Sequence, residues 1–333
     1  MIRSRPLSLI AVLLALLIPL AACGGDDDGA TGTATAPAQR AEVLLDWFPN
    51  ADHAGLIAAR ERGFFAEQGV TVTTSVPSDP AAALTQVAAG RSPFALSYQP
   101  EVLLARARGI PVRAVGAVFA QPLNAVIARE DRGIRRPRDL EGRTVGIAGV
   151  PSDRPLLDAV VRADGGDPAR VRTRTVGYTL APALVAGRVD AIIGAYWNIE
   201  VPEIESKGVG TVVLRLEEHG VPRYDELVLV TSDRVAEERP ELVRAVLSGL
   251  ARGQAWAADN PDEATDLVAA ANPDLSRAVL PEQVRLTAPL LSRDLRLGRD
   301  EWRTYADWMR RNELLRGEVD VAAAADPSFL PEG

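Results

Sequence analysis

The sequence has few of the side chains on which most enzyme chemistry depends. Among its 333 residues it has one cysteine, two histidines (His53 and His219) and one lysine, Lys207. Zinc-type metal sites need several histidine or cysteine ligands, so we expect no metal site. We also expect no cofactor. The scarcity of lysine also removes most candidates for a Schiff base. With a net charge of −8 there is no basic face for duplex nucleic acid, so we expect no nucleic-acid partner.

Residues 1–22 have the pattern of a secretory signal. Two arginines precede an apolar run, residues 7–20, that is too short to span a bilayer. Two alanines follow, and then Cys23. Residues 20–23 resemble a bacterial lipobox, which implies cleavage before Cys23 and lipidation of its sulfur. The alternatives are an uncleaved membrane anchor and a buried, apolar role for the cysteine. Residues 23–40 have no large apolar side chain and predict a flexible tether.

Beyond the tether, strand patterns alternate with helix patterns. Residues 70–76 (VTVTTSV) are β-branched with period two, and residues 79–90 follow as a helix with Asp79 at its N-cap. The chain is helical from about residue 232 nearly to residue 316. Repeated strand–helix units predict an α/β fold of two lobes with doubly wound, parallel sheets. The other predicted strands are residues 43–47, 94–98, 112–118, 125–128, 144–147, 173–176, 191–196, 209–214 and 227–231.

Three segments at or beside predicted strand ends combine aromatic rings with carboxylates. They are residues 46–55 (DWFPNADHAG), 194–200 (GAYWNIE) and 221–230 (VPRYDELVLV). Ligands of open α/β sheets bind beyond the carboxyl ends of strands. Rings stack on a flat heterocycle, and a carboxylate accepts paired hydrogen bonds from an amidine-like edge. Each segment alone is also consistent with a helix cap or a polar turn. The rings are Trp47, Tyr196, Trp197 and Tyr224, and the carboxylates are Asp46, Glu200 and Glu226.

Several motifs together resemble one known family. Residues 45–55 and 180–200, with 119–128, 139–153 and the YDELVL run, resemble the NMT1/THI5-like solute-binding proteins. The likeness is greatest to the pyrimidine-precursor binding lipoproteins of thiamine-salvage ABC transporters. It covers about residues 42–315 and implies a type II periplasmic binding protein fold, with two lobes, a hinge and a ligand cleft. The implied crossovers between the lobes are near residues 118–124 and 214–227. Lobe one is expected to comprise residues 41–120 and 226–316, and lobe two residues 121–225. The other implied parts are a signal peptide (1–22), lipidated Cys23 with the tether (23–40) and a C-terminal tail (317–333).

The resemblance implies an extracytoplasmic receptor, lipid-anchored to the cell membrane, for a 4-amino-2-methylpyrimidine thiamine precursor. The implied ligand is hydroxymethylpyrimidine or its formylaminomethyl analogue, an aromatic heterocycle. The implied partners are an ABC permease and its ATPase, and we expect a monomer. Backbone N–H groups before the helix predicted at residue 155 are expected to hold a polar ligand tail. The implied ligand-binding residues are Asp46, Trp47, Asn50, His53, Gly149, Ser152, Tyr196, Trp197, Glu200, Tyr224 and Glu226.

Two alternatives follow from the same resemblance. Eukaryotic members of the family are pyrimidine synthases that consume a histidine and a pyridoxal phosphate held on a lysine, and that carry a cysteine-rich iron motif. Here Lys207 lies in an ESKGVG turn and Cys23 precedes the fold, so we predict a receptor and no enzyme. Other proteins of the fold bind sulfonates, nitrate, taurine or riboflavin, and riboflavin would use the same aromatic walls. A sensor or adhesion lipoprotein that delivers no cargo stays open.

Overall fold

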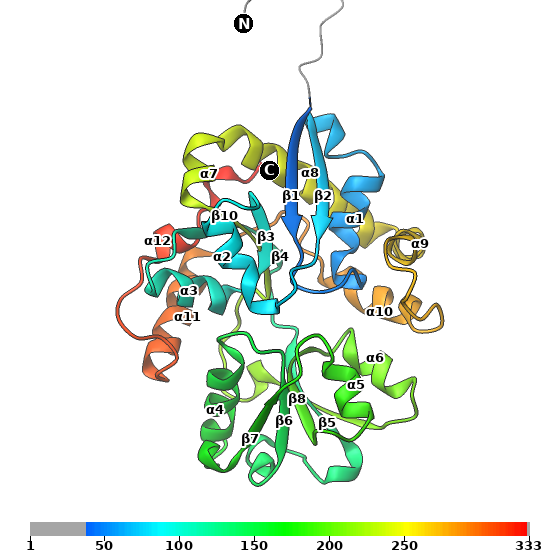
Figure 1. Cartoon of the computed structure of the whole chain (residues 1–333), viewed down its shortest axis with the longest axis vertical. Coiled ribbons are helices and arrows are strands. Elements are labelled where there is room, and N and C mark those ends of the chain that lie inside the picture. The colour runs from blue at the N-terminus through cyan, green and yellow to red at the C-terminus, as the bar shows by residue number, and fades with distance from the viewer. Residues whose placement is uncertain (1–37, 332–333) are drawn as a thin grey trace, which may run out of the picture. The chain divides into compact units, whose positions relative to one another are not determined.

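Each of two lobes is built around a five-stranded sheet (Figure 1). This computed structural model describes residues 38–331. The expected signal sequence, Cys23 and most of the tether lie outside the described residues. Strand β1 (Gln39–Leu44) already begins within the last two residues assigned to the tether.

In both sheets one strand runs against the others. The order in lobe one is β2-β1-β3-β10-β4, with β10 antiparallel to both neighbours, and in lobe two it is β7-β6-β8-β5-β9, with β5 antiparallel. The expectation of wholly parallel sheets is therefore wrong for β5 and β10. Each is the first strand after the chain changes lobe, so it starts at the cleft and runs away from it. The strands are β2 (Val70–Ser75), β3 (Phe94–Ser97), β4 (Val112–Phe119), β5 (Asn124–Arg129), β6 (Thr144–Ile147), β7 (Arg172–Thr175), β8 (Ala191–Tyr196), β9 (Thr211–Arg215) and β10 (Leu227–Ser232).

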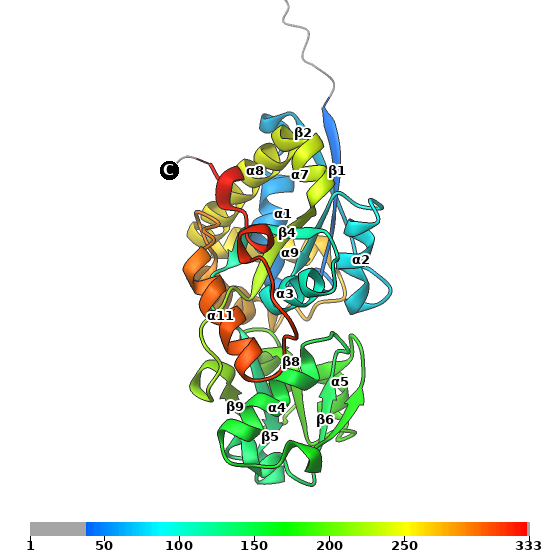
Figure 2. The same ribbon diagram turned by 90° about the vertical axis from the view of Figure 1, so that its left-hand side faces the viewer.

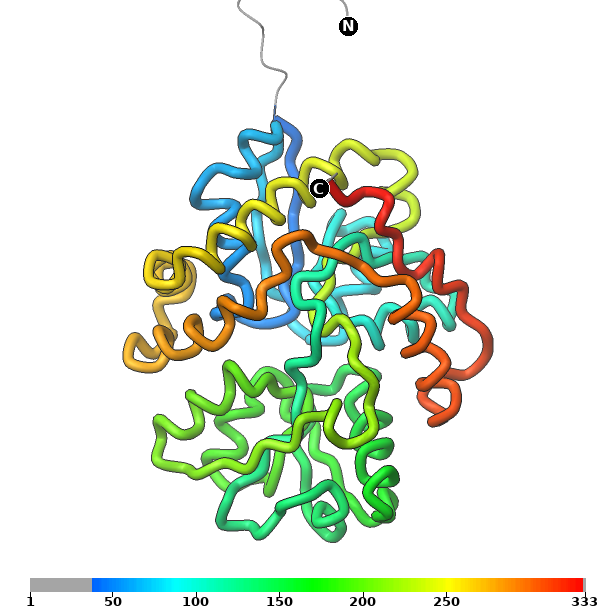
Figure 3. The backbone as a smooth tube through the Cα atoms, turned by 180° about the vertical axis from the view of Figure 1, so that it is seen from behind, coloured from blue at the N-terminus to red at the C-terminus, as the bar shows by residue number. Residues whose placement is uncertain are grey.

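The chain passes between the lobes twice, and both passages fall where the resemblance implied them. Residues 120–123 join β4 to β5, and residues 216–226 lead from β9 to β10. Both connections run through the middle of the back view (Figure 3). This arrangement, with two crossovers and a sheet in each lobe, is the type II periplasmic binding protein fold that we expected.

Most helices belong to lobe one, and α4 to α6 belong to lobe two (Figures 1 and 2). The expected C-terminal tail packs on lobe one, where Ala325 forms a bridge with Ala114 of β4 and Phe329 is buried. Within residues 38–331, no helix has the length and apolar character needed to cross a membrane. The helices are α1 (Ala54–Glu61), α2 (Ala83–Ala88), α3 (Gln99–Ala107), α4 (Asp153–Ala163), α5 (Leu180–Val185), α6 (Glu200–Glu205), α7 (Asp233–Glu238), α8 (Pro240–Asp259), α9 (Pro261–Ala271), α10 (Leu280–Thr287), α11 (Arg299–Arg311) and α12 (Val321–Ala324).

Helix α1 is held close to α8 because both helices carry a glycine at their contact. A Cβ on Gly253 would lie 2.1 Å from the carbonyl oxygen of Gly55, closer than any real Cβ contact. Since the first of the three site segments ends in the first turn of α1, this packing fixes the position of that segment at the edge of lobe one.

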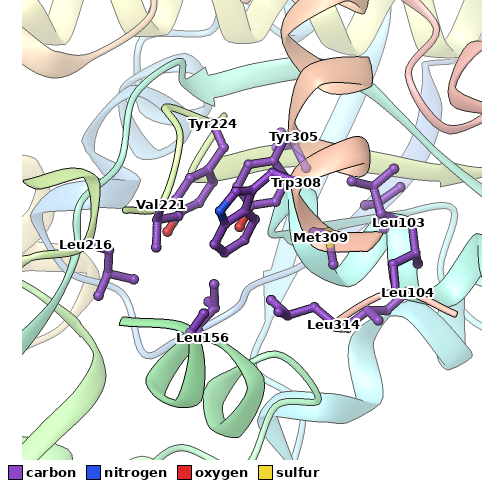
Figure 4. Close-up of a cluster of buried hydrophobic side chains, with 14 of the residues drawn as sticks. Leu103, Leu104, Leu156, Leu216, Val221, Tyr224, Tyr305, Trp308, Met309 and Leu314 are labelled. Carbon is purple, nitrogen blue, oxygen red and sulfur yellow. The ribbon is translucent and has the colours of Figure 1, made fainter. Parts of the chain in front are cut away.

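A core cluster extends from lobe one into lobe two (Figure 4). Its aromatic part stacks Tyr224 on Tyr305 with ring centroids 4.9 Å apart, and Tyr305 on Trp308 at 5.3 Å. Leu156 and Leu216 belong to the same cluster from lobe two. Tyr224 is only 2% exposed. Its ring is therefore part of the core, and it does not form the wall of a cleft as we had expected.

Candidate functional site

Hydrogen bonds to His53 hold the segment after β1 in place. Asn50 caps the short helix 51–53, with its side-chain oxygen accepting from Asp52 N at 2.8 Å, and its own N–H donates to His53 Nδ1 at 3.1 Å. Because Nδ1 is an acceptor, the hydrogen of the neutral ring is on Nε2, 3.0 Å from Asp46 Oδ1. His53 is 1% exposed and lines none of the pockets described below. In this structure it orders the turn and positions Asp46.

Asp46 and Tyr98 form one wall of the cleft. The Tyr98 hydroxyl donates to Asp46 Oδ2 at 3.0 Å, so both oxygens of Asp46 accept hydrogen bonds. Burial and the nearby Asp46 carboxylate raise the pKa of Tyr98 well above its usual value, which keeps the hydroxyl a donor. Trp47, next in the chain, lies edge-on to Tyr178 of lobe two at 4.7 Å. Lobe one therefore contributes an acid and two rings to this wall.

The opposite wall comes from the end of β8. The N–H of Tyr196 donates to Glu200 Oε2 at 2.6 Å, and burial raises the pKa of Glu200 well above its usual value. The Tyr196 hydroxyl is buried and has no hydrogen-bond partner among the described residues. Gly194 has φ +80°, and a Cβ there would lie 2.9 Å from Asp153 Oδ1. Glycine thus leaves space between β8 and that carboxylate.

Trp197 lies away from this wall, which corrects its expected role. Its ring is stacked under the Arg215 guanidinium at 4.2 Å and lines a separate pocket with Gln121 and Pro122 of the first crossover. Tyr196 is the last residue of β8, and successive strand side chains point to opposite faces. Only one ring of the adjacent pair can face the cleft, and in this structure that ring is Tyr196.

Glu226 closes the cleft at the hinge. Its Oε2 accepts three hydrogen bonds of 2.8 Å, from the backbone N–H groups of Leu123 and Asn124 and from the Tyr224 hydroxyl. Burial raises the pKa of Glu226 to about 7, although these donors oppose the rise. Tyr224 lines neither pocket described below and contacts the site by its hydrogen bond to Glu226.

The backbone donors expected at residues 149–152 are already engaged by the protein. The N–H groups of Gly149 and Val150 donate to Asp153 Oδ2 at 2.7 and 3.1 Å. The N–H of Ser152 donates to Glu101 Oε1 of lobe one at 2.8 Å. A ligand tail therefore finds no free N–H among these three, and Gly149 does not line the cleft. Burial raises the pKa of Asp153 to about 7.

Two adjoining pockets occupy the cleft between the lobes. We call them the inner pocket and the middle pocket. They share Trp47, Tyr98, Gly194 and Tyr196, and no arginine or lysine lines either within the described chain. The inner pocket adds Pro100, Asn124, Ala148, Val150, Ser152, Asp153, Leu156 and Glu226, and the middle pocket adds Asp46, Asn50, Asp52, Ile199 and Glu200.

The structure thus brings together seven of the expected residues: Asp46, Trp47, Asn50, Ser152, Tyr196, Glu200 and Glu226. Sequence reasoning missed Tyr98, Asp52, Asn124 and Asp153. Tyr98 directly follows β3, so the rule that ligands bind beyond strand ends could have found it. Nothing in the local pattern distinguishes Asp153 from an ordinary acid in the first turn of a helix.

Comparison with known proteins identifies the family. A family described as NMT1/THI5 like matches residues 50–264. The formylaminopyrimidine-binding protein of Halalkalibacterium halodurans is 39% identical over 79% of this chain and 78% of its own length. A 4-amino-5-hydroxymethyl-2-methylpyrimidine phosphate synthase of Legionella pneumophila is 25% identical (88% and 93% covered), and the riboflavin-binding protein RibY of Chloroflexus aurantiacus is 28% identical (100% and 99% covered).

A solved structure shows the same fold at lower identity. The alkanesulfonate-binding protein SsuA of Xanthomonas axonopodis pv. citri, bound to MOPS, superposes with a TM-score of 0.69 at 18% identity. The match covers 87% of this chain and 99% of that protein. The chain belongs to the NMT1/THI5-like family and has the periplasmic binding protein fold.

Proposed function

We propose that this protein is the solute-binding receptor of an ABC importer and captures a 4-amino-2-methylpyrimidine thiamine precursor. The ligand would be hydroxymethylpyrimidine or its formylaminomethyl analogue. One observation carries the proposal: the inner and middle pockets combine three aromatic rings with five carboxyl groups, and no cation lines them within the described residues. The name of the 39% identical relative points to the same ligand class.

An aminopyrimidine suits such a pocket because its edge both donates and accepts. Its exocyclic amine donates to a carboxyl oxygen, and the adjacent ring nitrogen accepts from a protonated carboxyl or donates when it is itself protonated. Asp52, Asp153 and Glu226 all have a pKa raised by burial to about 7. Near neutral pH a carboxyl group with such a pKa can therefore serve as a hydrogen-bond donor or as an acceptor. Tyr98 and Tyr196, with rings 6.3 Å apart, offer faces and edges for stacking.

Anionic ligands fit the site poorly. A sulfonate or nitrate would be desolvated beside Glu226, Asp153 and Asp46 with no arginine or lysine to pair with it in the described lining. Riboflavin carries flat rings without a negative charge, so it stays the second candidate and is separated from pyrimidines by the test below.

Contacts between the lobes support capture by closure. Tyr178 of lobe two donates to the carbonyl of Pro77 in lobe one at 2.9 Å, and Ser152 N donates to Glu101. Asn198 of lobe two donates to Asp52 and Thr287 of lobe one, each at 2.7 Å. A ligand that touches both walls adds to these contacts only when the lobes are together, so binding favours one closed shape that a permease can recognise.

The residues present do not fit the synthase alternative. A pyridoxal phosphate held on a lysine would need that lysine at the cleft, but Lys207 is exposed and lines neither the inner nor the middle pocket. We therefore propose a receptor that performs no reaction. Its proposed location is the extracytoplasmic face of the membrane, where a lipid on Cys23 would hold it as a monomer beside the permease and ATPase.

A thermal-unfolding series on the full-length protein tests the ligand class. The compounds are hydroxymethylpyrimidine, its formylaminomethyl analogue, riboflavin, taurine and nitrate. A ligand at one hundred times its dissociation constant stabilises the folded state by about 2.7 kcal/mol. We expect a shift of that order with a pyrimidine alone. Stabilisation by riboflavin, taurine or nitrate, with no response to the pyrimidines, would overturn the proposal.

A further inference from the structure

A third pocket adjoins the middle pocket and opens toward solvent. This outer pocket has a cavity volume of about 280 Å³ and shares Trp47, Asn50, Ile199 and Glu200 with the middle pocket. Both lobes contribute to it, through the segment after β1, through α5 and α6, and through residues around Asn272. The two pockets therefore adjoin, and a ligand longer than one ring that is held in the middle pocket could reach the outer one.

Aromatic side chains surround the entrance of the outer pocket. Phe48 is 49% exposed and is the one large hydrophobic side chain so exposed within residues 38–331. Its ring lies 5.1 Å from that of Tyr178, which in turn contacts Trp47 at 4.7 Å. The hydrogen bond from the Tyr178 hydroxyl to Pro77 holds this central ring in place. Trp47, Phe48 and Tyr178 all line this pocket, so a ligand that entered it would meet three aromatic rings.

The ionisable side chains that line the outer pocket are all acidic. Glu200, Glu203 and Asp274 line it, and no arginine or lysine does within the described residues. Glu203 is half-buried, and burial raises its pKa, an effect that Lys207 opposes. Carboxylates behind aromatic faces attract a cation, since a ring face carries negative potential and desolvation strengthens the contact. A phosphate or carboxylate would be repelled.

We propose that the outer pocket is a subsite for a positively charged second ring joined to the pyrimidine through a short link. The inference rests on the proposed function, because the pyrimidine is what the inner and middle pockets hold. The aromatic group Trp47, Phe48 and Tyr178 stacks on the second ring, and the carboxyl groups of Glu203 and Asp274 balance its charge. The receptor thereby prefers a pyrimidine with a cationic aromatic arm to the same ring with a neutral or anionic arm.

Calorimetric titration of the full-length protein with four compounds tests this preference. Hydroxymethylpyrimidine has no arm, its formylaminomethyl analogue a neutral one, hydroxymethylpyrimidine phosphate an anionic one, and thiamine a cationic aromatic ring. We expect thiamine to bind about tenfold tighter than hydroxymethylpyrimidine, in line with a cation–π contact of about 1–2 kcal/mol. We expect the phosphate to bind more weakly than hydroxymethylpyrimidine.

Two variants test whether the arm occupies the outer pocket. Phe48→Ala removes an exposed ring and Glu203→Gln a charge, and each is expected to weaken thiamine about fivefold or more while changing hydroxymethylpyrimidine less than twofold. Glu218→Gln removes an exposed carboxylate outside the cleft and serves as the control for net charge. Equal effects on both ligands, or no effect on either, would overturn the assignment of this subsite.

The outcomes separate the inference from the function on which it rests. If hydroxymethylpyrimidine binds and thiamine binds no tighter, the subsite is wrong and the pyrimidine receptor stands. If none of the four compounds binds, the proposed function fails, and the subsite fails with it. Tight binding of the phosphate would contradict the electrostatic argument directly.

Discussion

The carboxylate of Glu226 accepts a 2.8 Å hydrogen bond from the backbone N–H of Asn124. Asn124 is the first residue of β5 and Glu226 directly precedes β10, so this bond ties the two crossovers together at the floor of the cleft. One carboxylate thus belongs both to the hinge and to the inner pocket. A ligand that bonds to Glu226 acts directly on the segment about which the lobes turn.

Replacing Glu226 by glutamine should separate these two roles. The amide oxygen can still accept from Leu123, Asn124 and Tyr224, but the amide nitrogen replaces an acceptor with a donor at the pocket. We expect Glu226→Gln to keep its thermal stability near pH 6 and to weaken pyrimidine binding by about 1.5–3 kcal/mol. Calorimetry measures the change, and unaltered affinity would remove Glu226 from the recognition of ligand.

The stability of the unliganded protein should fall as pH rises through neutrality. Burial raises the pKa of Asp52, Asp153 and Glu226 to about 7, above the unfolded values near 4, so between these limits the folded state holds more protons. A pKa difference of one corresponds to about 1.4 kcal/mol per group. Urea unfolding at several pH values from about 5 to 8 should give a declining free energy of unfolding. A steady rise over that range would contradict the burial of these groups.

Two tryptophans give a matched test of the cleft. Trp47 lines all three pockets, whereas Trp197 lies under Arg215 in a separate pocket. We expect Trp47→Leu to weaken any flat ligand by about 0.5–1.5 kcal/mol through lost stacking. Trp197→Leu should leave affinity within twofold. If Trp197→Leu weakens the ligand and Trp47→Leu does not, the ligand binds on the side of β8 opposite to the one assigned here.

Asn198 should contribute both to stability and to closure. Its side-chain N–H group donates to Asp52 Oδ1 and Thr287 Oγ1, and the residue is fully buried. Asn198→Ala leaves the buried Asp52 carboxyl without a donor from lobe two, so we expect a loss of about 1–3 kcal/mol and weaker ligand binding. Chemical denaturation measures the first effect and calorimetry the second. The control is Asn312→Ala, since the Asn312 side chain bonds only to the Trp308 carbonyl at the end of its own helix; equal losses would contradict the role of Asn198.

Local signals predicted the framework well. The bounds of β6 and β8 agree with the expected residues, and Asp79 caps its helix by accepting from Ala81 N at 2.9 Å. Strand period, caps and turn residues act within a few positions, so a single segment contains the information. The direction of β5 and β10 depends on which lobe the chain comes from, and that is set only when the two halves are assembled.

The roles of individual side chains in the cleft could not be predicted from the sequence, because they depend on contacts between distant segments. His53 looked like a ligand contact, but its partners Asn50 and Asp46 make it a brace for the turn. Gly149 and Ser152 looked like free donors, but carboxylates from Asp153 and Glu101 take their N–H groups. Glu101 is distant in sequence and belongs to the other lobe. Residues from the three expected segments do line the cleft, while the position of each side chain in it followed from its tertiary neighbours.

The most direct test of the account is a calorimetric titration of the full-length protein with the formylaminomethyl pyrimidine, repeated at about pH 6 and pH 8. Because donors from the ligand stabilise the ionised carboxyl groups of the cleft, we predict saturable one-to-one binding, with protons released from those groups in the pH range around 7. Absence of binding at both pH values, together with binding of taurine under the same conditions, would contradict the central claim that this acidic, aromatic cleft recognises an aminopyrimidine.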